Sequence, residues 1–78
     1  MEVDVTGHAR ERMRKYDVSV ALLEDALQNP DSVVNGYGGR RIYQKKLNHH
    51  VLRVVIEESN GLKKAVTVYK ARGGRYGI

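Results

Sequence analysis

The sequence predicts an α+β fold in which an N-terminal helical hairpin packs on one face of a three- to four-stranded antiparallel sheet. Residues 7–28 carry apolar side chains at the spacing of two short amphipathic helices. Residues 51–69 alternate with a period of two on either side of Ser59-Asn60-Gly61, and Val, Ile, Thr and Tyr dominate both arms. Since the helices precede the strands, both helices are expected on one side of the sheet.

Length and composition exclude several classes of protein. A chain of 78 residues forms one domain and is too short to enclose a large active site. It lacks cysteine, and its three histidines are not spaced as ligands with nearby carboxylates, so no metal or cofactor is predicted. No run approaches the roughly 20 apolar residues of a membrane span, and the first residues are acidic. We expect a soluble, cytoplasmic protein without a membrane partner.

The charge is distributed unevenly along the chain. The net charge is +5, but residues 1–32 have a balance of −3 and residues 33–78 a balance of +8. The half that contains the sheet is therefore the cationic half. Such a surface favours RNA, DNA or an acidic protein segment as partner, and a basic protein without a specific partner is the alternative.

The N-terminal third predicts a short strand and two capped helices. Residues 2–5 alternate as a short edge strand would. Thr6 is the expected N-cap of a first helix, Ser19 the N-cap of a second, and Asn29-Pro30 ends the second helix. The apolar stripes consist of Ala9, Met13 and Tyr16 in the first helix, and of Val20, Leu23, Ala26 and Leu27 in the second.

The remaining chain predicts the strands. Residues 31–34 lead into a strand, and the glycine-rich loop that follows lacks the Lys-Ser/Thr end of a phosphate-binding loop. A strand at 40–47 turns at Asn48-His49-His50 into a central strand at 51–58, which pairs on its other side with 62–70. Residues 70–78 show no periodicity and are expected to form a mobile basic tail.

Alternation along the strands predicts what each face of the sheet carries. The helix-facing core is expected to contain Ile42, Leu52, Val54, Ile56, Val66 and Val68. The opposite face is expected to carry Arg41, Tyr43, Lys45, Arg53, Thr67 and Tyr69. Rings interleaved with cations are typical of single-stranded nucleic-acid platforms, and Arg72 and Arg75 of the tail add charge. The alternative is that Tyr43 and Tyr69 merely shield the sheet as a cross-strand pair.

Arg53 is the first functional clue. A guanidinium between Val51 and Val55 in a central strand needs a carboxylate, water or an anionic ligand. One interpretation is a structural ion pair with Glu11, Glu57 or another acid, and the other is a phosphate contact.

The order and spacing of several short motifs resemble the domain-of-unknown-function 4258 family. These motifs are TGHARERMR from Thr6, Val18-Ser19, LQNPD from Leu27, RIYQK from Arg41, LRVV from Leu52 and VTVY from Val66. The resemblance covers residues 6–76. This family is similar in turn to the RelE/ParE toxin superfamily. The resemblance implies a helical hairpin against a curved sheet, ribosome-associated mRNA cleavage or gyrase inhibition, and an antitoxin partner. The resemblance also implies functional residues of two kinds. One is an arginine on the central strand, here Arg53, and the other is basic or aromatic residues near the C-terminus, here Lys70, Arg75 and Tyr76.

Two functions follow as expectations. The first is a metal-independent endoribonuclease in which the RNA 2'-hydroxyl attacks the adjacent phosphate. In it His8, in the first turn of a helix, is the base, Arg12 and Arg53 hold the phosphate, and Tyr76 or Lys70 donates the proton. A structural hydrogen bond from His8 is the alternative to catalysis. The second function is a non-catalytic binding module for RNA, DNA or an acidic antitoxin-like protein, acting as a monomer or homodimer.

Overall fold

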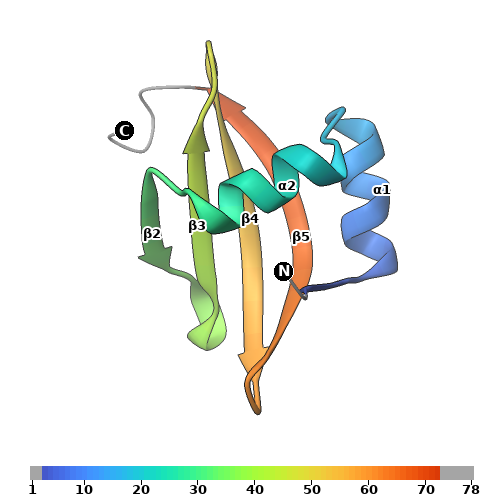
Figure 1. Ribbon diagram of the computed structural model, residues 1–78, viewed down its shortest axis with the longest axis vertical. Coiled ribbons are helices and arrows are strands. Elements are labelled where there is room, and N and C mark those ends of the chain that lie inside the picture. Colours follow the sequence, from blue (N-terminus) through green and yellow to red (C-terminus); the bar gives the residue numbers. More distant parts are fainter. Residues whose placement is uncertain (1–2, 73–78) are drawn as a thin grey trace.

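The computed structural model describes residues 3–72 and confirms the α+β class, with two N-terminal helices packed on a sheet (Figure 1). In chain order the elements are β1 (Val3–Val5), α1 (Gly7–Lys15), α2 (Val20–Gln28), β2 (Ser32–Asn35), a single 3-10 turn (Tyr37–Gly39), β3 (Arg41–Lys46), β4 (His50–Ser59) and β5 (Leu62–Arg72).

Both helices begin at the predicted caps. The Thr6 hydroxyl accepts a hydrogen bond from the Ala9 amide at 3.0 Å, and the Ser19 hydroxyl accepts one from the Leu22 amide at 3.0 Å. Each bond satisfies one of the amides that a helix start leaves without an internal partner. Asp17, with a φ of 56°, turns the chain between the helices. Within residues 3–72, neither helix is long and apolar enough to cross a membrane.

The sheet has five strands in the order β1-β5-β4-β3-β2, and it is mixed. The predicted central position of β4, between β3 and β5, is confirmed. The prediction of a purely antiparallel sheet of three to four strands is wrong, because β1 joins it as a parallel edge strand beside β5. Val3 lies opposite Lys63, and the Thr6 amide donates to the Ala65 carbonyl at 3.2 Å. A three-residue strand carries no local signal for a partner at the far end of the chain.

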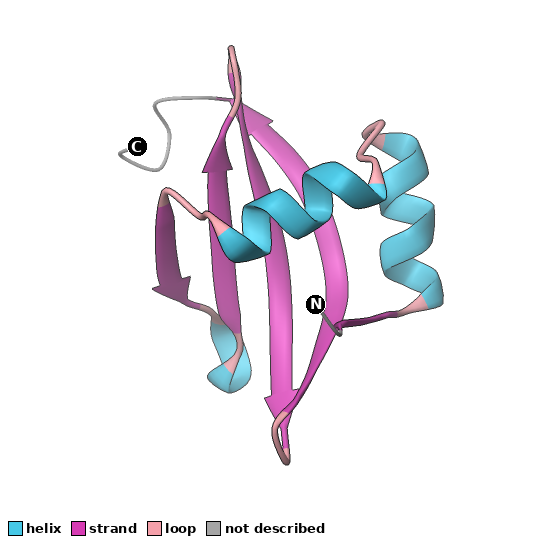
Figure 2. Ribbon diagram, viewed as in Figure 1, coloured by secondary structure: helices cyan, strands magenta, loops and turns pink. Residues whose placement is uncertain are grey.

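The helices contact different strands. α1 contacts β5 and lies beside it, whereas α2 contacts β3 and β4 and crosses the sheet (Figure 2). Leu52, Val54 and Ile56 point to the helix side, as predicted, and are at most 2% exposed. They form the core with Ala9, Met13, Val18, Leu23, Ala26, Leu27, Ala65 and Val68.

The faces of β3 are the reverse of the prediction. The Leu47 amide donates to the His50 carbonyl at 2.8 Å, which leaves a loop of two residues, Asn48 and His49, where three were expected. One residue fewer in the loop shifts the pairing by one position, and such a shift moves every side chain of the strand to the other face.

The resulting register places Arg41 opposite Ile56, Tyr43 opposite Val54 and Lys45 opposite Leu52. Since directly paired residues share a face, these three side chains lie on the helix side. Ile42, expected in the helix-facing core, lies opposite Val55 on the face turned away from α2. We call this the second face; its central strands carry Ile42, Gln44, Lys46, Val51, Arg53, Val55, Thr67 and Tyr69.

A bulge in β5 corrects one further core assignment. Val55 pairs with Thr67 and Ile56 pairs with Ala65, so Val66 is the extra residue. Ala65 therefore occupies the core position that the strict alternation gave to Val66. The Val66 carbonyl accepts a hydrogen bond from the Thr6 hydroxyl at 3.3 Å, so the bulge joins β5 to the start of α1.

Candidate functional site

A groove of about 220 Å³ lies between one flank of α1 and β5. The helix contributes three side chains at successive turns, and the strand contributes three consecutive residues. The lining residues are His8, Arg12, Tyr16, Thr67, Val68 and Tyr69. We call this the α1–β5 groove. His8 and Arg12 are four residues apart on α1, so they project from the same flank of the helix into this groove.

Tyr69 links this groove to a row of polar side chains on the second face. Its hydroxyl oxygen accepts a hydrogen bond from Arg53 Nη1 at 2.5 Å, and Arg53 Nε donates to Gln44 Oε1 at 3.0 Å. Arg53 is 9% exposed and Gln44 is 1% exposed. Because a guanidinium only donates, the Tyr69 oxygen is the acceptor, and its own proton is available to a different acceptor.

The sequence left two interpretations of Arg53, a structural ion pair and a phosphate contact, and its hydrogen bonds bear on both. Two of these hydrogen bonds go to neutral side chains, the amide of Gln44 and the phenol of Tyr69. Glu57, one of the acids considered for a structural ion pair, binds Arg40 at 3.2 Å instead. Arg53 also lies over the Tyr69 ring, with its guanidinium carbon 5.5 Å from the ring centroid. Arg53 therefore fixes the orientation of Tyr69.

Arg53→Met is expected to lower the free energy of unfolding by about 1–3 kcal/mol. Methionine keeps the aliphatic volume, but the buried Gln44 oxygen loses its donor, and a stranded buried acceptor costs about that amount. Urea denaturation measures the change. The double variant Arg53→Met with Gln44→Leu is the control, because removing both partners is close to neutral. Equal destabilisation in the single and double variants would contradict the importance of this pair.

The structure does not assemble the predicted nucleic-acid platform. Arg41, Tyr43 and Lys45 lie on the helix side because of the β3 register, and the Tyr43 ring lies under Lys63, whose Nζ is 5.7 Å from its centroid. Arg53 and Tyr69 remain on the second face, opposite each other.

Lys70 and Arg72, the C-terminal candidates that the structure describes, do not line the α1–β5 groove. Lys70 pairs with Leu52 and Arg72 with His50, so both side chains point to the helix side. Both residues belong to β5, so the tail expected from residue 70 onward does not begin there. Arg75 and Tyr76 lie outside the described residues.

The sequence model of the DUF4258 family, described as "Domain of unknown function (DUF4258)", matches residues 5–70. The chain belongs to the DUF4258 family. The matched stretch contains α1, β4 and most of β5, and so includes both walls of the α1–β5 groove. No curated protein and no solved structure matches the chain significantly. The family description names no activity, so the function of this DUF4258 domain is inferred from the geometry of its site.

Lys45, a predicted nucleic-acid contact, ties α2 to β3 in this DUF4258 domain. Its Nζ lies 3.3 Å from Asp25 Oδ2 and donates to the Asn29 carbonyl at 2.9 Å. Asn29 Nδ2 in turn donates to Asp25 Oδ1 at 3.1 Å. A lysine at a helix C-terminus satisfies carbonyls that the helix leaves without a partner. Lys45 therefore has a structural role at the end of α2.

Acid is expected to weaken the attachment of α2. The hydrogen bonds from Asn29 and Lys45 lower the pKa of Asp25 below its ordinary value of 3.8. A lowered folded pKa means that the unfolded chain binds more protons, so this contribution is present above pH 3.8 and is lost as pH falls through the lowered pKa. Amide exchange at the end of α2 between pH 6 and pH 2 measures it.

Asp25→Asn should already show at pH 6 part of the loss of amide protection, measured relative to intrinsic exchange, that the wild-type domain shows only in acid. Glu24→Gln, at an exposed position of the same helix, is the matched control because it leaves the contact with Lys45 intact. Identical exchange in the wild type and Asp25→Asn across the whole pH range would contradict the assignment.

Three residues of the site were missed by the sequence analysis. Gln44 was not considered because the β3 faces were reversed, and Thr67 had no assigned role beyond its face. Tyr16 was counted as part of the apolar stripe, and it does pack against the core while also lining the groove. Within residues 3–72, no three His, Asp or Glu side chains are grouped closely enough to hold a metal ion.

Proposed function

We propose that this DUF4258 protein is a RelE/ParE-toxin-like endoribonuclease that cleaves RNA without a metal ion in the α1–β5 groove. One observation carries the proposal. The groove brings an imidazole, a guanidinium and a phenol together, from His8, Arg12 and Tyr69. The phenol is held by a second guanidinium, that of Arg53.

These groups match the needs of 2'-hydroxyl attack on phosphorus. His8 takes the proton of the 2'-hydroxyl as its oxygen forms a bond to phosphorus. Arg12 stabilises the additional negative charge on the phosphorane oxygens. Tyr69 donates its proton to the 5'-oxygen as the P–O5' bond breaks, and the proton held by His8 later restores the phenol through solvent. The products are a 2',3'-cyclic phosphate and a 5'-hydroxyl.

Tyr69 replaces Lys70 and Tyr76 as the proton donor in this proposal. Lys70 does not line the α1–β5 groove, whereas Tyr69 does. Its hydroxyl oxygen already accepts a hydrogen bond from Arg53, so the hydroxyl proton is directed to a different acceptor. The likeness to RelE/ParE toxins comes through the DUF4258 family and through helices packed on a sheet, and it supports the proposal by analogy.

The test incubates the purified protein with end-labelled RNA in EDTA, with and without ribosomes. Cleavage with a 2',3'-cyclic phosphate terminus is expected, and an RNA with a 2'-deoxyribose at the cleaved position should remain intact. Cleavage of that deoxy-substituted position would overturn the mechanism.

The second candidate function is RNA binding without cleavage, and the observation that favours it is the guanidinium of Arg12 in the groove. It predicts that affinity for RNA falls as the salt concentration rises, because phosphate contacts release counterions. Binding with no cleaved product under any of these conditions would favour it over the endoribonuclease.

A further inference from the structure

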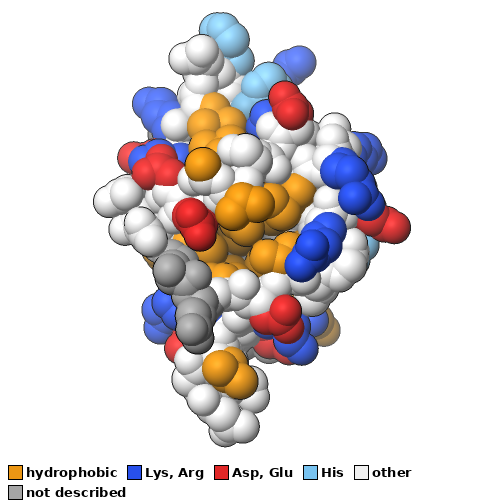
Figure 3. Space-filling model, turned by 45° about the vertical axis from the view of Figure 1, so that its right-hand side comes forward, with side chains coloured by type: hydrophobic (Ala, Val, Ile, Leu, Met, Phe, Trp, Pro, Cys, Tyr) orange, Lys and Arg blue, Asp and Glu red, His pale blue; other side chains and the backbone are white. Residues whose placement is uncertain are grey.

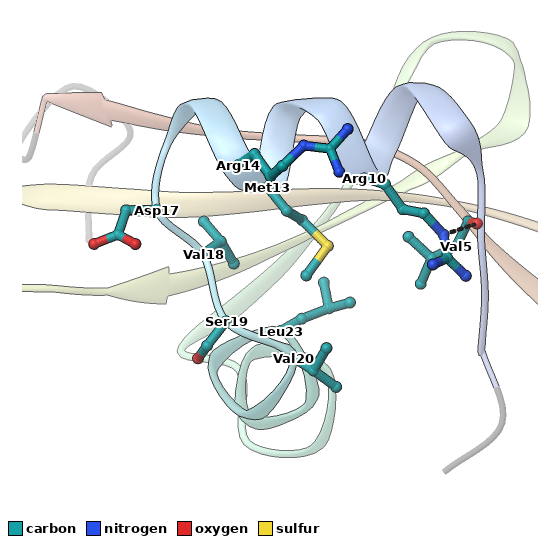
Figure 4. A pocket seen from close by; sticks show the side chains of 9 residues that line it. All are labelled: Val5, Arg10, Met13, Arg14, Asp17, Val18, Ser19, Val20 and Leu23. Atoms are coloured by element: carbon teal, nitrogen blue, oxygen red, sulfur yellow. Dashed lines mark hydrogen bonds between the residues drawn. The ribbon is translucent and has the colours of Figure 1, made fainter.

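A second, larger groove of about 580 Å³ opens between α1 and α2. Met13 of α1 faces Leu23 and Val20 of α2 across it, and Val18 of the connecting turn completes its apolar floor (Figure 4). We call this the helix groove. Its volume is within the range of sites that hold a ligand or an inserted side chain.

The apolar surface of the helix groove is open to solvent. Val20 is 64% exposed although it lies beside Val18 and Leu23, which are 6% and 3% exposed. Figure 3 shows hydrophobic side chains gathered on this face of the molecule, with Lys or Arg side chains on one side of them. An apolar area bordered by charge is typical of a site for a protein partner.

The basic flank belongs to α1. Arg10 and Arg14 line the helix groove and lie one turn apart, and α1 as a whole has four Lys or Arg against one Glu. Arg10 Nε donates to the Val5 carbonyl at 3.5 Å, which holds this side chain over the end of the groove (Figure 4). Asp17 also lines the groove, but its carboxylate points away from Met13 and Leu23 (Figure 4).

We infer that the helix groove binds an acidic amphipathic helix from a partner protein. Aliphatic side chains of that helix enter between Met13 and Val20, and two carboxylates one turn apart pair with Arg10 and Arg14. The i,i+4 spacing of the arginines matches this spacing of carboxylates on a helix, which favours a helix as occupant. This inference goes beyond RNA cleavage, because His8 and Arg12 line a different groove.

The probe is a synthetic helical peptide of about 18 residues, long enough to be helical on its own, with leucines on one face and glutamates beside them. A second peptide carries lysine at each glutamate position. Fluorescence polarisation measures both affinities, and methyl NMR spectra report the contacted residues. The glutamate peptide is expected to bind at least about tenfold more tightly and to shift the methyl signals of Met13, Val20 and Leu23.

Two variants test the residues that define the helix groove. Val20→Asp and Arg14→Glu should each weaken binding of the glutamate peptide at least about tenfold. Val20 is the first residue of α2, where a carboxylate interacts favourably with the helix dipole, so folding is preserved. Arg72→Glu, the same charge change at an exposed position of β5, is the control and should change the affinity by less than about twofold.

Three outcomes would overturn the inference. Equal affinity for the two peptides would remove the role of the arginines, and methyl shifts only at Thr67 or Val68 would place the peptide in the α1–β5 groove. The third is a wild-type dimer in sedimentation that Val20→Asp converts to a monomer, which would assign the helix groove to a second copy of this chain. Cleavage of RNA is measured separately, so failure of either proposal leaves the other testable.

Discussion

Val54→Asp is expected to unfold the domain. Val54 is fully buried in the central strand β4, between Tyr43 of β3 and Val68 of β5. A carboxylate there would be buried without a cation, which costs several kcal/mol beyond the lost apolar contact. A domain of this size has a total stability of roughly 4–12 kcal/mol, so that cost is a large part of it or all of it. Circular dichroism and thermal melting measure the result.

The matched control is Val33→Asp, the same substitution in the edge strand β2. Val33 is 41% exposed, so its carboxylate would remain hydrated, and the expected change is within about 0.5 kcal/mol. A soluble Val54→Asp variant that melts cooperatively near the wild-type temperature would contradict the placement of this residue in the core.

His8→Ala should lower the rate of RNA cleavage by about 10²–10⁴-fold, the usual effect of removing a positioned general base. His8 is exposed on α1, so the fold should be unchanged. Affinity for the intact RNA should change by less than about twofold, because Arg12 still supplies the cation that lines the groove. Single-turnover cleavage and filter binding at one salt concentration separate the two quantities.

His49→Ala is the matched control, since His49 is an exposed histidine in the loop between β3 and β4, away from the α1–β5 groove. Its cleavage rate should equal that of the wild type. If both variants cleave at the wild-type rate, His8 is not the base. If His8→Ala loses affinity and rate equally, its role is in binding.

Local signals predicted the elements that depend on near neighbours. Thr6 and Ser19 cap the helices because a hydroxyl next to a helix start has a nearby amide to accept from. Asn60-Gly61 forms the β4–β5 turn because both residues adopt positive φ, at 54° and 77°. These features depend on a few consecutive residues, and the sequence contains all of that information.

Features that depend on pairing between distant segments were not predictable in the same way. The length of the loop at Asn48-His49 decides which face Tyr43 and Lys45 occupy, and nothing within residues 40–47 encodes it. The bulge at Val66 is another example, because it lies where β5 contacts Thr6, sixty residues earlier.

The candidate site was predicted only in part, because some of its features depend on spacing within one element and others on cross-strand register. His8 and Arg12 lie four residues apart in one helix, and that spacing is enough to put them on one flank. Arg53 and Tyr69 were also placed correctly on one face. Their link through a hydrogen bond to the phenol, and the buried amide of Gln44 behind it, depend on the cross-strand register.

The pairing of β1 with β5 has a consequence for how the chain folds. Val3 meets Lys63, so the first strand can pair only after nearly the whole domain has been synthesised. Closing a loop of this length has a large entropic cost, which delays such contacts relative to the β4–β5 hairpin. During translation, β1 therefore has no strand to pair with until β5 has emerged from the ribosome. In stopped-flow refolding, protection of the Thr6 amide should therefore be among the last to develop.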